Sequence, residues 1–226
     1  MTDYRRYAVY YAPPNGSALA QFGAAWLGWD AEAGVEVPHP DSALDVAQVT
    51  ATPRKYGFHG TLKPPFVLAD GTDRQGLEAA VAALAMQHAS FAVPIRLARL
   101  GRFCALVPDG PAPKLADLAA NCVTQLDDFR APPGEAELRR RRAKGLTAAQ
   151  EAHLTRWGYP FVMDEFRFHL TLTGALDPAD APIVEAELAR LTAPLTAEPL
   201  PVREIALFGE APDGRFRILS RHALTG

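Results

Sequence analysis

The sequence predicts an α+β protein built from two related lobes, and three observations favour this fold class. The chain has 226 residues, which suits one domain of ordinary size or two small lobes that share a cleft. Apolar residues make up 48% and charged residues 22% of the chain, so we expect a soluble globular protein. Patterns typical of strands and helices alternate, and one order of elements occurs twice.

The first half of the chain contains clear strand and helix patterns. Residues 4–12 are rich in tyrosine and valine and stop at two prolines, which predicts a strand. Residues 17–29 carry apolar side chains at near-helical spacing, which predicts a helix. The further elements expected here are a loop over 30–52, a strand over 56–62 that ends at Lys63-Pro64-Pro65, a helix over 72–88, two strands within 91–107 with a turn at Gly101, and a helix over 114–129.

The second half continues the alternation. Thr147-Ala-Ala-Gln150 has the pattern of a capping box, so we expect a helix to begin there and to run toward Trp157. The further elements expected are a strand over 165–173, a helix over 179–191, and a closing hairpin of 202–208 and 215–220 around Pro212-Asp213-Gly214.

The order strand, helix, strand, turn, strand occurs once from His59 and once from His169. Leu-Ala-Arg-Leu-Gly101 ends 42 residues after His59, and Ile-Ala-Leu-Phe-Gly209 ends 40 residues after His169. Gly-Arg-Phe also occurs twice, at 101–103 and at 214–216. Because there are only two copies, the repetition indicates two related lobes and not a solenoid. Coincidence in a regular α+β chain is the alternative.

The charge and the cysteine content limit the class of function. The formal net charge is −3, whereas a protein that grips long nucleic acid usually has a basic excess. We therefore expect a small phosphorylated substrate and do not favour nucleic acid as a partner. Cys104 and Cys122 lack disulfide or metal-site spacing and are expected in the core of a protein in a reducing compartment. The start of the chain has no signal-peptide pattern and no apolar run is long enough to span a membrane, so we expect a cytoplasmic protein.

Two of the predicted strands each contain a His-x-Thr-Leu sequence. Side chains alternate between the two faces of a strand, so His59, Thr61 and Lys63 are expected together, opposite Phe58 and Leu62. In the second strand the polar face consists of Arg167, His169, Thr171 and Thr173, and the apolar face consists of Phe166, Phe168, Leu170 and Leu172. Each strand thus has an apolar back and a polar front.

The polar fronts have the groups that phosphodiester chemistry needs. One histidine can activate the attacking hydroxyl or water and the other can protonate the leaving oxygen, because the pKa of histidine suits both roles near neutrality. The hydroxyls of Thr61 and Thr171 can donate to phosphate oxygens, and Lys63 and Arg167 supply positive charge. We expect no metal and no cofactor, since the other histidines lack ligand spacing. A half-buried polar pair is the alternative for either motif alone.

The two motifs resemble the hallmark of the two-histidine (2H) phosphoesterase superfamily, which contains bacterial RNA 2′-5′ ligase-like proteins and cyclic nucleotide phosphodiesterases. The longer strings, over residues 54–66 and 158–174, resemble an uncharacterised branch encoded in bacterial phosphonate-utilisation operons. One departure is Gly60, where that branch leads us to expect alanine.

The resemblance implies a single domain over residues 1–226, with two pseudo-symmetric antiparallel β-sheets flanked by helices around a central cleft. It implies that His59 and His169 are the catalytic acid/base pair and that Thr61 and Thr171 bind phosphate. It further implies metal-independent opening of a cyclic phosphodiester on a small sugar phosphate or nucleotide, with a phosphorylated ribose cyclic phosphate from phosphonate breakdown as a candidate substrate. Either histidine can be the acid.

Three further features have alternative interpretations. Tyr56 can contact a sugar or base of the substrate or pack in the core, and Lys55 can reinforce the anion site. The basic cluster Arg139–Arg142 suits a lid over an anion or an RNA contact, but we favour a solvated helix face balanced by Glu135, Glu137 and Glu151. Two other functions stay open: RNA end processing as a 2′,3′-cyclic phosphodiesterase or 2′-5′ ligase, and non-catalytic sensing of a phosphorylated ligand.

Overall fold

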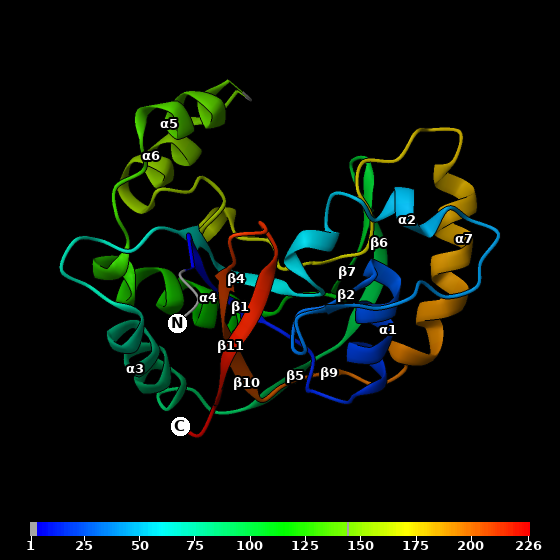
Figure 1. Cartoon of the computed structure of the whole chain (residues 1–226), viewed down its shortest axis with the longest axis horizontal. Helices are drawn as coiled ribbons and strands as arrows, with labels where there is room; N and C mark the ends of the chain where they lie inside the picture. The colour runs from blue at the N-terminus through cyan, green and yellow to red at the C-terminus, as the bar shows by residue number, and fades with distance from the viewer. Residues whose placement is uncertain (1–3, 144) are drawn as a thin grey trace.

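A seven-stranded antiparallel sheet runs through the centre of the protein, in the order β11-β10-β1-β4-β8-β7-β6 (Figure 1). The structure is a computed structural model that describes residues 4–143 and 145–226. The strands of this sheet are β1 (Tyr7–Tyr11), β4 (Gly60–Phe66), β6 (Ile95–Leu100), β7 (Phe103–Pro108), β8 (Leu170–Thr171), β10 (Glu204–Glu210) and β11 (Phe216–Ala223). Two small sheets pair β2 (Trp29–Asp30) with β3 (Val35–Glu36) and β5 (Phe91–Val93) with β9 (Leu200–Val202).

Helices flank the large sheet. They are α1 (Ala18–Leu27), α2 (Val46–Val49), α3 (Arg74–Ala85), α4 (Pro113–Gln125), α5 (Glu135–Arg142), α6 (Ala148–Trp157) and α7 (Ala181–Thr192), with short 3-10 turns η1 (Arg54–Tyr56), η2 (Asp127–Phe129), η3 (Met163–Glu165) and η4 (Ala193–Leu195). The α+β class, with a large antiparallel sheet and flanking helices, is therefore confirmed. Among the described residues, no helix has the length and apolar character needed to cross a membrane.

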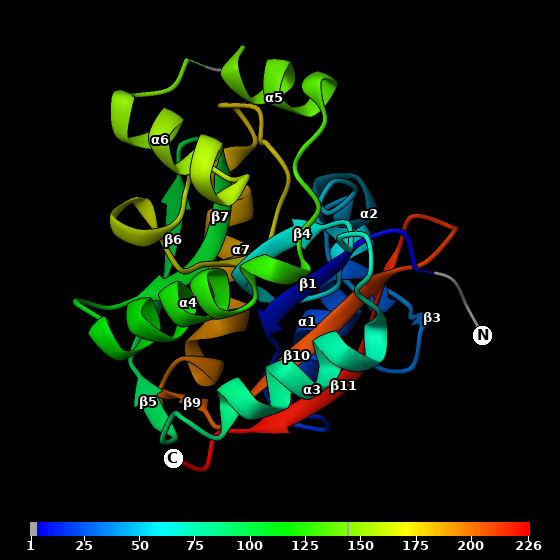
Figure 2. The same cartoon turned by 90° about the vertical axis from the view of Figure 1, so that its left-hand side faces the viewer.

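The large sheet consists of two halves that meet at one residue pair. We call β11-β10-β1-β4 the first half-sheet and β8-β7-β6 the second half-sheet. Their only registered pair joins Gly60 of β4 to Leu170 of β8, within the part of the chain that the structure describes. The two expected sheets are thus joined edge to edge. Figure 2 shows α3 and α4 lying across the first half-sheet, while α7 packs against β6 of the second.

The two sequence repeats exchange their hairpins between the half-sheets. The hairpin β6–β7, which follows β4 and α3 in the chain, pairs with β8. The hairpin β10–β11, which follows β8 and α7, pairs with β1 beside β4. Each half-sheet therefore contains strands from both repeats, so the expectation of one repeat per lobe needs this correction. The repeats explain the pseudo-symmetry around the β4–β8 pair.

Strand β1 separates two apolar clusters. All five of its residues are buried. Tyr7, Val9 and Tyr11 point into the main core, which the helices cover, whereas Ala8 and Tyr10 point into a smaller cluster on the opposite face. That smaller cluster also contains Phe208 and Phe216. The candidate site lies on the Tyr10 face of the sheet.

Both histidine strands are placed differently from the sequence prediction. Instead of a strand over 56–62, residues Arg54–Tyr56 form η1 and β4 runs from Gly60 to Phe66. The prolines do not end β4, because they lie in an irregular stretch: Tyr7 is opposite Phe66 and Val9 is opposite Lys63, which leaves Pro64 and Pro65 between these pairs. The second strand is short, since only Leu170–Thr171 form β8 within the predicted range 165–173.

The connection between α4 and β8 contains two helices that stand above the sheet in Figure 1. The predicted capping box is confirmed at α6, where the Thr147 hydroxyl accepts from the Gln150 backbone N–H and the Gln150 side chain accepts from the Thr147 backbone N–H. Helix α5 has its acidic residues in the first turn and its four arginines in the last turn. This order of charges matches the helix dipole and stabilises a short helix.

Candidate active site

The two histidine motifs lie side by side on adjacent antiparallel strands. His59 directly precedes β4, and His169 directly precedes β8. Because Gly60 is opposite Leu170, the antiparallel register sets His59 beside Thr171 and Thr61 beside His169. The side chains at these four positions share the sheet face that lies opposite the buried Leu62 and Leu170. Each histidine therefore has the threonine of the other motif as its cross-strand neighbour.

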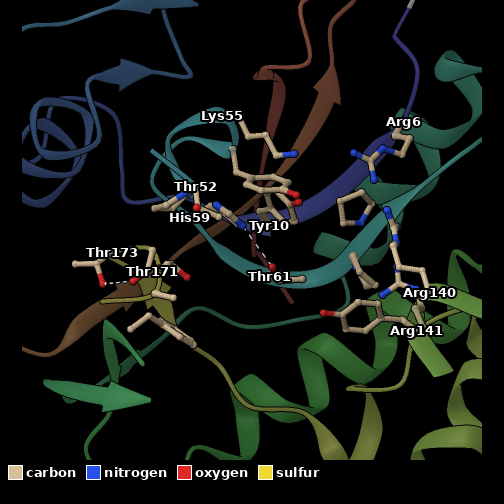
Figure 3. Close-up of a pocket in the computed structure, with 18 residues that line it drawn as sticks. Arg6, Tyr10, Thr52, Lys55, His59, Thr61, Arg140, Arg141, Thr171 and Thr173 are labelled. Atoms are coloured by element: carbon tan, nitrogen blue, oxygen red, sulfur yellow. Dashed lines mark hydrogen bonds between the residues drawn. The ribbon is translucent and has the colours of Figure 1, made fainter. Parts of the chain in front are cut away.

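A cleft opens over these side chains. One cavity of about 650 Å³ is lined by His59, Thr61 and Thr171 (Figure 3). A neighbouring cavity of about 550 Å³ is lined by His169 and Arg167. The two cavities are neighbouring parts of one cleft, because Thr61, Pro64, Phe103 and Tyr159 line both. Cavities of this size suit a small-molecule ligand.

Both imidazole rings are oriented by the same local bond. The distance from His59 Nδ1 to the Gly57 carbonyl oxygen is 2.9 Å, and that from His169 Nδ1 to the Arg167 carbonyl oxygen is 2.8 Å. A carbonyl only accepts, so the hydrogen-bond network assigns the proton to Nδ1 in each ring. In the neutral rings Nε2 is then the nitrogen that can take a proton. The Thr61 hydroxyl lies 3.4 Å from Nε2 of His59.

Gly57 makes the turn that presents its carbonyl to His59. Its φ of 72° lies in the left-handed region, which favours glycine. A Cβ at this position would also lie 2.6 Å from the Cβ of Ala31. Glycine is thus required here on two grounds.

His59 lies deep in the protein beneath an aromatic stack, although part of its side chain reaches the cleft. Its ring stacks on Tyr10 at a centroid distance of 3.9 Å, and Tyr56 lies 5.9 Å away. The pKa of His59 is lowered to about 4, chiefly by burial and also by the nearby His169, while the bond to the Gly57 carbonyl acts in the opposite direction. His59 is therefore neutral at physiological pH.

Lys63 does not reach the cleft, and this part of the sequence prediction is wrong. Its side chain is 2% exposed, and Nζ donates to the Val123 carbonyl at 3.0 Å and lies 3.6 Å from Asp127. The reason is a register shift, since Val9 is opposite Lys63 while Tyr10 is opposite Thr61. The extra residue on β4 reverses the alternation, so Lys63 points with Val9 into the main core.

The other predicted contact residues lie in the cleft. Arg167 is exposed and lines the cavity that contains His169. Lys55 and Tyr56 line the cavity that contains His59, with the Lys55 ammonium 4.9 Å from the centre of the Tyr56 ring. Tyr56 also stacks on Phe216 at 5.1 Å, so its ring both packs against the smaller apolar cluster and lines the cleft. Their roles stay predictions.

The structure adds three arginines that the sequence analysis did not assign to the site. Arg6, Arg140 and Arg141 line the cavity of His59. Our expectation that Glu135, Glu137 and Glu151 balance the cluster Arg139–Arg142 is confirmed, and Arg140 and Arg141 in addition line the cavity. Helical spacing alone does not show what α5 packs over, and the sequence contains no signal for its position above the cleft.

Several polar groups near the site have structural partners. Arg6 forms a bidentate ion pair with Glu210, at 2.6 and 2.9 Å. Thr173 accepts from the Cys104 backbone N–H at 3.0 Å and donates to the Gly174 carbonyl at 2.8 Å. Cys104 and Cys122 are free and buried, as expected. Over the ranges 4–143 and 145–226, no group of three or more His, Cys, Asp or Glu residues is arranged to hold a metal ion.

Comparisons with known proteins identify one matching family profile and two curated relatives that share a name. The family profile described as "Protein of unknown function (DUF1045)" matches residues 61–217. The chain is 39% identical over 227 residues to "Ribose 1,5-bisphosphate phosphokinase PhnN" of Janthinobacterium sp. (strain Marseille), covering 92% of this chain and 48% of that protein. It is 41% identical over 212 residues to the protein of the same name in Laribacter hongkongensis (strain HLHK9), covering 92% and 49%. The chain thus spans about half the length of these curated relatives.

Solved structures give a weaker similarity. E. coli LigT complexed with 3′-AMP matches with a TM-score of 0.44 and 16% identity, over 99% of this chain and 100% of that chain. E. coli LigT complexed with phosphate matches with a TM-score of 0.42 and 16% identity, over the full length of both chains. These values are too low to support a function, and we base the function on the chain's own side chains.

Proposed function

Since the chain belongs to the DUF1045 family, we propose for this member a metal-independent phosphoesterase activity that opens a cyclic phosphodiester on a small sugar phosphate or nucleotide. One observation carries the proposal. The Gly60–Leu170 pair sets two His-x-Thr motifs in antiparallel register, with both Nδ1 atoms bound to backbone carbonyls. Two such imidazoles beside two hydroxyls match the needs of in-line attack at phosphorus.

The proposed mechanism divides the proton transfers between the histidines. The hydroxyls of Thr61 and Thr171 donate to the non-bridging oxygens of the cyclic phosphate. Nε2 of neutral His59 takes a proton from the attacking water as the new P–O bond forms. Protonated His169 gives a proton from Nε2 to the ring oxygen as the old P–O bond breaks, so the product is a phosphomonoester with a free hydroxyl. Burial supports His59 as the base, because it keeps the ring neutral near pH 7.

The relatives support a phosphorylated ribose as the substrate class. The whole relatives are named for a ribose 1,5-bisphosphate phosphokinase, and this chain matches about half of them. The sequence lacks a G-x-x-x-x-G-K-[ST] loop, which many kinases use to bind ATP phosphates. We therefore assign the kinase step to the half that this chain does not match. The matched half would then open a cyclic phosphate on phosphorylated ribose, a reaction that acts on the same class of compound as the kinase step. This role is consistent with phosphonate catabolism.

A hydrolysis assay tests the proposed activity. The purified protein, treated with EDTA, is given a ribose cyclic phosphate and a 2′,3′-cyclic nucleotide, and the phosphomonoester product is measured. We expect turnover in EDTA and a loss of about 10²–10⁴-fold for His59→Ala and for His169→Ala. Activity that requires added metal, or that survives both substitutions, would refute the mechanism.

RNA end processing is the second candidate, and the four basic side chains that line the cleft favour it. It predicts faster turnover of an oligonucleotide with a 2′,3′-cyclic end than of a cyclic mononucleotide, with a steep dependence on salt. A sensor predicts that these compounds bind without turnover. Adding this oligonucleotide to the ribose cyclic phosphate and the cyclic nucleotide therefore separates all three functions.

A further inference from the structure

We propose that Arg140 and Lys55 form a second anion subsite in the cleft, and that the substrate carries a phosphomonoester group in addition to the phosphodiester that reacts. This inference rests on the proposed function and adds to it the residues that would bind a second phosphate. It is based on the charges that line the cleft and on where they lie.

The arginines of α5 differ in their partners. Arg139 pairs with Glu135 at 3.9 Å, Arg141 with Glu137 at 2.5 Å, and Arg142 with Glu151 at 2.7 Å. These are the three glutamates that the sequence analysis expected to balance the cluster. Arg140 has no ion pair and no hydrogen bond with any residue that the structure describes, yet it lines the cavity of His59. An exposed arginine is usually solvated and contributes little, but this one faces a concave cavity that other cations share.

The cavity has an excess of positive charge. Four cationic side chains line it, and none of its described lining residues is an aspartate or a glutamate. Arg6 and Arg141 are neutralised by Glu210 and Glu137. The Lys55 ammonium lies over the Tyr56 ring and has no carboxylate within ion-pair distance among the described residues. Two cations without an ion pair among the described residues therefore remain, Lys55 and Arg140.

This excess is greater than the reacting group requires. A cyclic phosphodiester carries one negative charge, which the two threonine hydroxyls and protonated His169 can stabilise. A phosphomonoester carries about −1.5 to −2 charges at pH 7, and it is bound well by arginine and lysine. Two free cations thus match a second phosphate of the monoester type. An internal phosphate of RNA has only one charge and matches them less well.

The positions of the cations fit a small substrate that spans the cleft. Figure 3 shows His59, Thr171 and Thr173 toward one side of the pocket and Arg6, Arg140 and Arg141 toward the other. Lys55 extends above the middle of the pocket. Tyr10, Tyr56 and Thr61 also line this cavity of about 650 Å³. A sugar between a cyclic phosphate at His59 and a phosphate at Arg140 would occupy it.

The subsite is tested with matched substrates. A ribose 1,2-cyclic phosphate and the same compound with a 5-phosphate are compared, and so are 2′,3′-cyclic AMP and its 5′-phosphorylated form. We expect the added phosphate to raise kcat/KM by about 10- to 100-fold. Arg140→Ala should remove this preference and change turnover of the compounds without the added phosphate by less than about 3-fold. Arg139→Ala, one residue away and outside the cavity, is the matched control and should keep the preference.

The outcomes separate the subsite from the activity. Equal turnover of both members of each pair, or an equal effect of Arg140→Ala on both, overturns the subsite and leaves the proposed function intact. A preference for oligonucleotides that depends on Arg140 also overturns it, in favour of RNA. If no compound is hydrolysed, calorimetry with ribose 5-phosphate decides: His59→Ala should bind it and Arg140→Ala should bind it at least about 10-fold more weakly. Equal binding by the two variants refutes the subsite.

Discussion

The two histidine motifs have the same backbone geometry but different surroundings. In both, the ring follows a turn, precedes a strand, and donates from Nδ1 to the carbonyl two residues earlier. His59, however, is stacked against Tyr10 at 3.9 Å, whereas the ring of His169 is tilted against Phe103 at 5.8 Å and lies close to the exposed Arg167. The local backbone therefore leaves Nε2 as the free nitrogen of each ring, and in the proposed mechanism the packing around each ring decides which proton transfer it favours. Pseudo-symmetry in structure does not require symmetry in chemistry.

The largest expected effect separates base from acid. His59→Gln and His169→Gln should each lower kcat/KM for a cyclic phosphate by about 10²–10⁴-fold. With a p-nitrophenyl phosphodiester, whose leaving group needs no proton, His169→Gln should lose less than about 10-fold and His59→Gln should lose as much as before. The rates of nitrophenol release measure this difference. If the p-nitrophenyl substrate restores turnover to His59→Gln and not to His169→Gln, His59 is the acid and His169 is the base.

The next largest effect is expected at Gly60, which is paired with Leu170 between the two motifs. A Cβ on Gly60 would lie 2.3 Å from the ring of Phe168, which directly precedes His169. Gly60→Val, which adds two methyl groups beyond that Cβ, should therefore displace the second motif, lower the free energy of unfolding by about 1–3 kcal/mol and reduce kcat about 10-fold or more. Thermal or urea unfolding and steady-state kinetics measure both quantities. Gly134→Val, where no atom lies within 4 Å of the new Cβ, is the control and should leave kcat unchanged.

A smaller effect follows from the burial of His59. Because a base must be unprotonated, kcat/KM of the wild type should fall as the pH drops through about 4. Tyr10→Leu opens the ring to water, so the pKa of His59 should rise toward about 6.5 and move this acidic limb to higher pH. Phe103→Leu, beside His169, should leave that limb in place. The pH profile and NMR titration of the His59 ring protons measure the shift, and an unmoved limb in Tyr10→Leu would contradict it.

The smallest effect on activity is expected at Lys63. Lys63→Met should change KM by less than about 2-fold, and it should lower the free energy of unfolding by about 1–2 kcal/mol, because the buried Val123 carbonyl loses its donor. Asp127 keeps Arg130 as a partner at 2.8 Å, so it is not left unpaired. Lys55→Met, at the cleft, should instead raise KM for a cyclic phosphate that carries an added phosphomonoester. A marked rise in KM for Lys63→Met would restore Lys63 to the anion site.

The contrast between Lys63 and Thr61 shows how far the sequence predicts the site. Alternation correctly placed Leu170 and Leu172 in the core and His169 opposite them, because β8 is regular. The same rule failed at Lys63, since an extra residue on β4 is invisible in a strand pattern that contains two prolines. Arg140 was missed for another reason: its position depends on how α5 packs in three dimensions.

The same distinction holds for the fold. The capping box at Thr147 and the turn at Gly101 are local signals, and the structure contains both. The repeated order of elements predicted two related units, but not that their hairpins change places. Which strand pairs with which depends on contacts between residues that are far apart in the sequence, such as Ala105 with Thr171 and Tyr10 with Ala206, and no short sequence pattern specifies them.

The exchange of hairpins has a consequence for the synthesis of the protein. Strand β1 emerges first, but one of its two neighbours, β10, starts only at Glu204. Until β10 is made, β1 has an open edge, and Tyr10 lacks Phe208 as a packing partner. The aromatic packing around His59 and Tyr10 is therefore completed only when β10 has been made. A protein cut before residue 204 would contain both histidines, and we expect it to lack the proposed activity.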